Sequence, residues 1–400
     1  MRWFDRCIYF LDAFSMGLLV PVMTLVFLSH GATVATLSLF VAVAAVTIVA
    51  AELPSGIIVD MIGRKKIFIL AHVFRIVSYL FLYFWKEPVT LFFSMICRGI
   101  AMAFSSGSYE ALLVEQYVKI HGEGQLSRIN RILMQMDGAG CGLAAILGGF
   151  LGMIGKDYRL LLVVILLLDS IILFLSIFCI EEEWFRKNQH RPFEEWKNHI
   201  SLMCQGVGRS RTVGSLLFLS AMMGLLVSVV ESYWQQTMVQ MLPEQRRWLL
   251  GLISCLAYLC SMWGSKIGEK VIDLCNNDKK WIEEKKLCWI YRILLAISIM
   301  VLGVARNAML FVVLYSIVYI LVGAGDLCER TILHREIENK YRASMLSVYS
   351  LFIRGGAVVS ALLTSGIVSH YDISYVWILT PVIALGGMAI MIVVKKLCRR

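Results

Sequence analysis

The strongest constraint on the fold is a series of apolar runs, each about 20 residues long, that recurs along the whole sequence. A helix of about 20 residues crosses the hydrocarbon layer of a bilayer and satisfies its backbone hydrogen bonds internally. Twelve runs can be placed, with predicted bounds 7–28, 33–58, 67–85, 88–113, 129–154, 159–180, 212–240, 248–268, 287–305, 308–329, 343–369 and 373–394. The first run is followed at once by another, so we interpret it as a retained helix, not a signal peptide.

Composition supports a membrane protein. Apolar residues form 59% of the 400 residues and charged residues 16%, whereas soluble domains carry about 25% charged residues. The 11 cysteines and seven histidines show no metal-ligand spacing, so no metal is expected. The sequence has no phosphate-binding glycine-rich motif and no catalytic constellation. We therefore predict an all-α polytopic membrane protein, without a cofactor, that is not an enzyme.

The distribution of Lys and Arg predicts the orientation. If the termini are placed on one side, the opposite side receives only a few basic residues, namely Lys86, Lys156, Arg159, Arg246, Arg247 and Arg306. Loops rich in Lys and Arg face the cytoplasm. Both termini are therefore expected to be cytoplasmic, in a multi-pass protein of the cell membrane. The net charge of +10 is then explained by topology and does not indicate a nucleic-acid partner.

The longest non-apolar stretch, 181–211, divides the runs into six and six. Phe193, Trp196, Ile200 and Met203 recur there at helical spacing, which predicts an amphipathic helix on the membrane surface. The predicted domains are an N-terminal six-helix bundle (1–181), a cytoplasmic linker (182–211) and a C-terminal six-helix bundle (212–400).

Residues 56–66 read GIIVDMIGRKK between the second and third runs, and we expect a tight, basic loop there. The set Gly56, Asp60, Gly63, Arg64 and Lys65 resembles the loop between the second and third helices of the major facilitator superfamily. The preceding residues, ELPSG at 52–56, are typical of its bacterial drug:proton antiporter subgroup with twelve transmembrane helices. The resemblance implies two six-helix bundles and assigns these five residues to gating.

In that family the Asp60 carboxylate would face the start of the eleventh helix, where Ser344 could cap the helix. Arg64 and Lys65 could hold the Asp60 carboxylate or lipid phosphates. The fifth run contains Gly140, Ala144, Ala145, Gly148 and Gly149, small residues that permit close helix packing. Antiporters of the family usually have glycine and proline where Ala144 and Ala145 stand, which weakens the case for antiport.

Charges inside the membrane are costly and usually line a cavity. The candidates are Asp12, Arg75, Arg98, Glu110, Asp137, Asp169, Glu231, Arg292, Asp326, Glu329 and Arg354. Glu231 is the best central candidate for proton coupling. For Asp12 the alternative is a side chain that reaches the membrane interface. Asp137 could instead belong to gating.

The remaining site residues come from the fourth and seventh runs. Glu110, in a segment that resembles the same subgroup, could carry a proton or pair with a basic loop residue. Arg98 resembles an arginine that the family often keeps in its fourth helix. Tyr233, Trp234 and Gln235 could line a cavity for an amphiphilic ligand, or could form an aromatic belt at the outer interface.

The resemblance implies a proton-coupled efflux transporter for a small amphiphilic compound, working by alternating access, functional as a monomer and embedded in the lipid bilayer. The alternatives are an importer or uniporter for a metabolite, and a transporter-like sensor that binds a ligand without transport. The expected partners are the bilayer, a small-molecule substrate and protons, with no nucleic acid.

Overall fold

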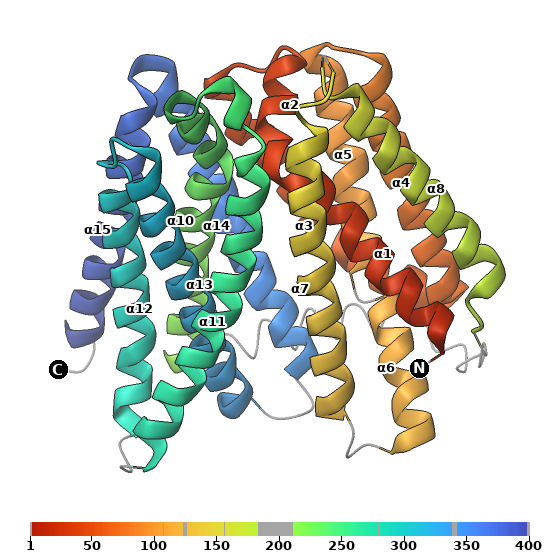
Figure 1. Ribbon diagram of the computed structural model, residues 1–400. Helices are drawn as coiled ribbons and strands as arrows, with labels where there is room; N and C mark the ends of the chain where they lie inside the picture. The colour runs from red at the N-terminus through yellow and green to blue at the C-terminus, as the bar shows by residue number, and fades with distance from the viewer. Residues whose placement is uncertain are drawn as a thin grey trace. The chain divides into compact units, whose positions relative to one another are not determined.

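The computed structural model describes residues 2–106, 108–122, 126–155, 157–182, 211–277, 281–337 and 342–397, and these contain helices and no β-strand. The helices, shown in Figure 1, are α1 (Trp3–Leu19), α2 (Met23–Ser29), α3 (Val34–Ile62), α4 (Arg64–Phe84), α5 (Pro88–Ser105), α6 (Tyr109–His121), α7 (Leu126–Leu151), α8 (Arg159–Cys179), α10 (Arg211–Met241), α11 (Leu249–Asn277), α12 (Trp281–Leu302), α13 (Ala308–Glu336), α14 (Arg342–His370) and α15 (Val376–Leu397). Short 3-10 turns are η1 (Val20–Val22), η3 (Glu244–Arg246) and η5 (Ile373–Tyr375). The all-α prediction is confirmed.

Within the described residues, ten helical segments are long and apolar enough to cross a membrane. Helix α3 adds a shorter apolar stretch, Leu37–Glu52, and α12 begins with the charged residues 283–286. Both lie where the second and ninth runs are predicted. The chain is thus a multi-pass membrane protein, and the number twelve stays a prediction.

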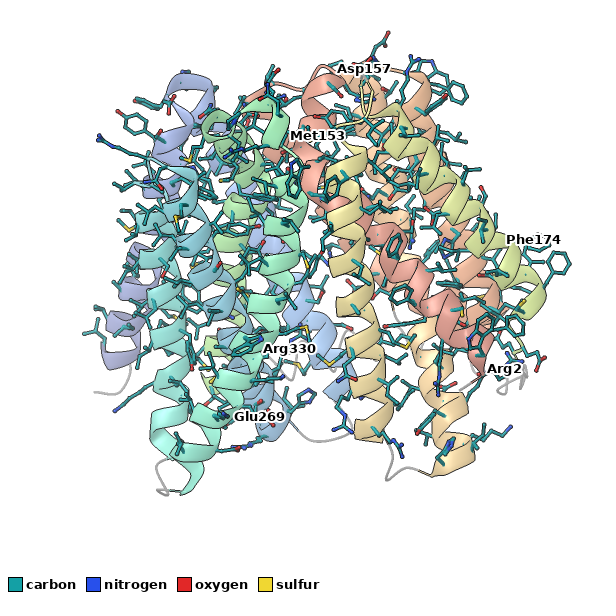
Figure 2. All side chains as sticks on the ribbon, viewed as in Figure 1. Arg2, Met153, Asp157, Phe174, Glu269 and Arg330 are labelled. Atoms are coloured by element: carbon teal, nitrogen blue, oxygen red, sulfur yellow. The ribbon has the colours of Figure 1, made fainter. Side chains whose placement is uncertain are left out.

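Helix α8 has an exposed apolar stripe of the kind that contacts lipid. Leu167, Ile171, Phe174 and Phe178 are all exposed, and their spacing of four, three and four places them on one face of a helix. Phe174 points away from the neighbouring helices in Figure 2. Exposed apolar surface of this extent marks an interaction with lipid or another apolar partner.

Three predicted segments differ from the structure. The first run is interrupted at η1, where Pro21 cannot donate the helical hydrogen bond. The fourth run is divided into α5 and α6. The expected loop at 56–66 is wrong, because α3 continues to Ile62 and α4 begins at Arg64. Gly63 alone makes the break, with φ at 96°, which favours glycine.

The chain forms two compact units. The first comprises Met1–Thr33, Val43–Pro192 and Leu242–Tyr258, and the second comprises Val34–Ala42, Phe193–Met241 and Leu259–Arg400. Each half of the chain therefore lends a short segment to the unit of the other half. The predicted linker helix, with Phe193, Trp196, Ile200 and Met203, lies outside the described residues.

In the first unit α1 packs along α7 and α8, and α4 packs along α5 and α8. In the second unit α10 packs against α12, α13, α14 and α15. Small residues make the closest crossings. A Cβ atom on Gly148 of α7 would overlap the Leu18 carbonyl of the first span, and one on Gly356 of α14 would overlap the Ala221 carbonyl of α10. The close packing predicted for the fifth run is confirmed.

Candidate functional site

The start of α4 is capped by the carboxylate of Glu182, which follows α8 in the chain. The backbone N–H groups of Arg64 and Lys65 donate to Glu182 Oε1 at 2.7 Å and Oε2 at 3.1 Å. A carboxylate at this position satisfies unpaired N–H groups and faces the positive end of the helix dipole. A side chain at position 63 would collide with this carboxylate, since a Cβ atom there would lie 2.8 Å from Glu182 Oε2.

The two basic side chains of the motif also bind within this unit. Arg64 Nη2 forms an ion pair with Glu115 Oε1 at 2.6 Å. Lys65 Nζ donates to the carbonyls of Ile177 and Ile180, both at 2.7 Å, and so caps the end of α8. The predicted contacts of Arg64 and Lys65 with the Asp60 carboxylate or lipid phosphates stay predictions.

The remaining motif residues, Gly56 and Asp60, lie in α3, and their side chains lie outside the described part of the structure. The same is true of the Ser344 side chain at the start of α14. The predicted contact between Asp60 and the eleventh helix therefore stays a prediction.

A buried polar cluster joins α1, α4 and α8 near the middle of each helix. Arg75 Nη1 contacts Asp12 Oδ1 at 2.6 Å and Asp169 Oδ1 at 3.4 Å. His72 lies between the same two aspartates, with Nδ1 at 3.0 Å from Asp169 Oδ1 and Nε2 at 3.5 Å from Asp12 Oδ1. The Ser15 hydroxyl donates to Asp169 Oδ2 at 2.9 Å. Asp12 is thus part of an internal site, and the interface alternative is wrong.

Asp12, Arg75 and Asp169 were predicted as intramembrane charges, whereas His72 was not identified from the sequence. One signal was available. His72 precedes Arg75 by three residues, so both side chains lie on the same face of α4. A polar pair on one face of an apolar helix indicates that this face points away from lipid.

The other candidates of the first unit lie around this cluster. Arg98 Nη1 donates to the Tyr79 hydroxyl at 3.3 Å. Glu110 and Asp137 are both exposed and interact electrostatically with each other, and Asp137 interacts in the same way with Asp12. The structure therefore brings together Glu110 and Asp137, which are far apart in sequence.

Glu231 lies in the second unit, within α10 (Figure 1). The span in α10 is the most buried of the ten, with 67% of its apolar window covered, yet Glu231 is exposed. Among the described residues, no hydrogen bond or ion pair reaches its carboxylate. The Glu231 carboxylate interacts electrostatically with the Tyr319 phenol of α13.

The three residues predicted beside Glu231 are packed inside this unit. Tyr233, Trp234 and Gln235 are nearly fully buried. The Tyr233 hydroxyl donates to Ser38 Oγ at 3.2 Å, and the Trp234 ring lies 5.2 Å from the Tyr315 ring between centroids. Their part in ligand binding stays a prediction.

The second unit holds its own buried charge cluster. Arg292 Nε of α12 donates to Glu329 Oε1 of α13 at 2.6 Å, with both side chains fully buried. The Tyr349 hydroxyl of α14 donates to Glu329 Oε2 at 2.8 Å and lies 3.1 Å from Asp326 Oδ1. Asp326 also pairs with Arg330 at 2.9 Å. The four side chains thus form one network that joins α12, α13 and α14.

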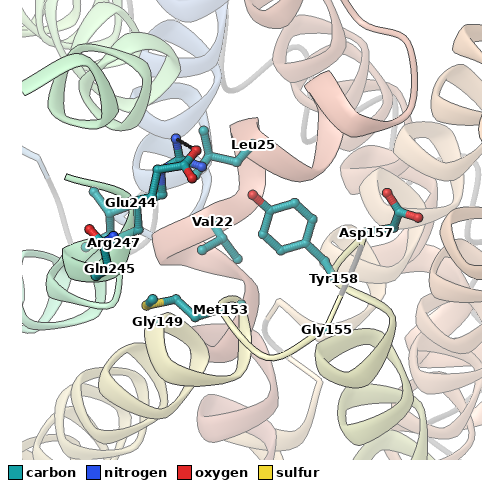
Figure 3. Close-up of a pocket in the computed structure, with 12 residues that line it drawn as sticks. Val22, Leu25, Gly149, Met153, Gly155, Asp157, Tyr158, Glu244, Gln245 and Arg247 are labelled. Atoms are coloured by element: carbon teal, nitrogen blue, oxygen red, sulfur yellow. Dashed lines mark hydrogen bonds and ion pairs between the residues drawn. The ribbon is translucent and has the colours of Figure 1, made fainter. Parts of the chain in front are cut away.

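A cavity of about 420 Å³ lies in the first unit (Figure 3). It is lined by Val22, Leu25, Gly149, Gly152, Met153, Gly155, Asp157, Tyr158, Glu244, Gln245, Arg247 and Leu250. Figure 3 shows the Tyr158 ring on one side and the ion pair between Arg247 and Glu244 on the other. Asp157 and Tyr158 have positive φ values of 64° and 58°, an unfavourable conformation for both residues.

The pKa values of two side chains at this cavity are shifted from their ordinary values, one by a hydrogen bond and the other by burial. The hydrogen bond from Lys86 holds the pKa of the Asp157 carboxyl below its ordinary value. Burial raises the pKa of the Tyr158 phenol, and Arg247 opposes this shift. Both residues belong to the connection between α7 and α8, outside the spans.

The structure is that of a polytopic helical membrane protein with charged side chains buried inside its helices. The sequence matches the Major Facilitator Superfamily over residues 7–325. The chain therefore belongs to this superfamily. No curated protein sequence matches it.

Solved structures with the same fold span almost the whole chain. A mutant form of the nucleoside transporter NupG has a TM-score of 0.80 at 11% identity, covering 96% of this chain and 98% of its own. A POT family transporter in complex with 5-aminolevulinic acid has a TM-score of 0.73 at 12% identity, covering 98% and 95%. The peptide transporter POT in complex with sulfate has a TM-score of 0.75 at 11% identity, covering 98% and 94%. At these identities the likeness establishes the fold alone.

Proposed function

We propose that the chain is a secondary active transporter that exports a small amphiphilic compound in exchange for protons by alternating access. The observation that carries this proposal is Glu231, an exposed acid within the most buried span. A carboxylate inside a membrane span usually faces a polar cavity. Without a cationic partner in the described protein, it can bind either a proton or a cationic substrate.

The ring that interacts with Glu231 supports an amphiphilic ligand. Tyr319 lies 4.9 Å from the Tyr315 ring between centroids, and Tyr315 in turn contacts Trp234. A carboxylate at the edge of an aromatic group can hold a cation while the rings contact an apolar body. Glu110, Arg98 and Asp137 are proposed as further polar residues of the transport path.

Two observations bear on direction. The motif at 52–65 resembles drug:proton antiporters, which favours export. The names of the structurally similar proteins, a nucleoside transporter and a peptide transporter, favour the alternative, uptake of a polar metabolite. The protein is proposed to act as a monomer in the cell membrane, with both termini in the cytoplasm and twelve crossings. Gating is proposed to involve Gly56, Asp60, Gly63, Arg64 and Lys65.

Transport into inverted membrane vesicles tests the proposal. The vesicles are prepared with and without the protein, a pH gradient is imposed, and uptake of lipophilic cations, nucleosides and short peptides is measured. We expect a lipophilic cation to accumulate only with the protein and only while the gradient lasts. Flux of a nucleoside or peptide in the opposite direction would establish the importer instead, and binding without any flux would establish a sensor.

A further inference from the structure

The cluster of Asp12, His72, Arg75 and Asp169 carries an unbalanced charge. With both aspartates ionised, Arg75 charged and His72 neutral, the four side chains sum to one negative charge. The His72 and Asp169 side chains are fully buried, and a net charge at mid-span is costly. One added proton makes the cluster neutral.

The geometry around His72 has room for that proton. A neutral imidazole carries one N–H group, so it donates to one of the two aspartates and leaves its other nitrogen facing a carboxylate oxygen. Among the described residues, His72 Nε2 has no hydrogen-bond partner, and neither does the buried Arg75 Nη2. An imidazolium would donate at both ends and turn the 3.5 Å contact to Asp12 into a charge-assisted hydrogen bond.

We propose that this cluster is a proton-binding site, with the proton shared between His72 and Asp12, and that it is distinct from Glu231. The site deepens the proposed proton coupling and rests on it for its biological role. Asp12 provides the entry, since its side chain is 13% exposed while His72 is fully covered. Protonation strengthens the contact between α1 and α4, and so links proton binding to the packing of two spans.

The side chains around the cluster are compatible with a proton-binding site. On α4 the Phe68 ring lies edge-on to the imidazole, 4.6 Å away between centroids. Among the described residues, the other titratable groups around the cluster are Tyr79 of α4, Arg98 of α5, Tyr9 of α1, Tyr109 and Glu110 of α6, and Asp137 and Cys141 of α7. Arg98 donates a hydrogen bond to Tyr79 and, within the described residues, forms no ion pair with Asp12 or Asp169. Asp137 interacts electrostatically with Asp12, and its negative charge favours a proton bound to the cluster.

Proton uptake by the purified full chain in lipid nanodiscs tests the site without any substrate. The protein is titrated from about pH 8 to about pH 5, the range in which histidine changes charge, and uptake is compared with that of His72→Gln and Asp12→Asn. We expect each variant to bind about one proton fewer than the unsubstituted chain.

The two variants keep the test decisive. If His72→Gln fails to fold, judged by helical circular dichroism, Asp12→Asn decides, because it neutralises the cluster without removing the imidazole. Unchanged uptake in every folded variant would overturn the inference. If the unsubstituted chain shows no pH-driven flux in the vesicle assay, the proposed function is overturned, but the proposed proton site is not. If transport is driven by protons but the cluster takes up no proton, the proposed proton site is overturned and the proposed function is not.

Discussion

Glu231 is the residue on which the proposed exchange of protons for cations depends most directly. Glu231→Gln mimics the protonated carboxyl and breaks no ion pair of the described structure, so the variant should fold and be as stable as the unsubstituted chain. We expect it to lose pH-driven transport of lipophilic cations while still binding neutral ligands. Vesicle transport and thermal unfolding of the purified protein measure the two properties.

A matched control is Glu269→Gln, which alters another exposed carboxylate, on α11 (Figure 2). This variant should transport normally. Loss of stability in Glu231→Gln would indicate a structural carboxylate, and a stable variant with unchanged pH dependence would exclude Glu231 from coupling.

The ion pair between Lys86 and Asp157 predicts a pH-dependent effect. Lys86 lowers the pKa of Asp157 in the folded protein. Asp157 therefore stabilises the fold at pH values above its pKa in the unfolded chain, about 3.9. This stabilisation is lost as pH falls through the folded value. Lys86→Gln should therefore lower the unfolding temperature slightly at neutral pH, with the difference vanishing in acid. Lys270→Gln, an exposed lysine of α11, is the control, and a difference that persists in acid would contradict the assignment.

At this scale the sequence predicted residue types better than partners. Arg64 and Lys65 were identified by their motif, but Glu182 and Glu115 lie more than 50 residues away in the chain. His72 was missed because an isolated histidine in an apolar run looks like an ordinary buried side chain. Its importance arises only where α1, α4 and α8 converge, which spacing along one helix cannot reveal.

At the scale of elements, the close crossing of helices α10 and α14 can be tested by substituting two adjacent glycines. Gly355 and Gly356 are neighbours on α14, yet a Cβ atom at 355 meets nothing within 4 Å, while one at 356 overlaps the Ala221 carbonyl. Gly356→Ala should destabilise the protein by about 1–3 kcal/mol, as overpacking does. Gly355→Ala should be neutral or slightly stabilising, since alanine favours helix.

Thermal unfolding of the two variants measures this difference, and each variant serves as the control of the other. Equal stability would show that α10 and α14 separate at low cost and that their crossing is not tightly packed.

Element boundaries were predictable where length and hydropathy decide them. Helices α8 and α10 begin and end within a residue of the predicted runs. The failures are local. The basic residues after Ile62 suggested a loop, but one glycine with positive φ suffices to turn the chain, because the Glu182 carboxylate caps the next helix at once. Pro21, and Ser106 and Ser108 between α5 and α6, interrupt apolar runs that hydropathy alone treats as continuous.

At the scale of the whole molecule, the two halves of the chain repeat one packing arrangement. In the first unit α1 crosses α7, and in the second α10 crosses α14, each through glycines that meet a carbonyl of the partner helix. These are the first and fifth runs of each predicted half. Each unit also buries an arginine on the third run of its half, Arg75 or Arg292, against carboxylates. The two halves of the chain thus share the way in which their first, third and fifth runs are packed, and the division into six and six stays a prediction.

The predicted topology can be tested on intact cells. Glu87 precedes α5 and Glu269 lies on α11; both are exposed, and the basic-residue map assigns them to opposite sides of the membrane. If both termini are cytoplasmic, a cysteine at Glu87 should react with an impermeant thiol reagent from outside, and one at Glu269 should react only after permeabilisation. The unsubstituted chain, with its 11 cysteines, sets the background. The opposite pattern would invert the map, and labelling of both sites from outside would mean an even number of crossings between them.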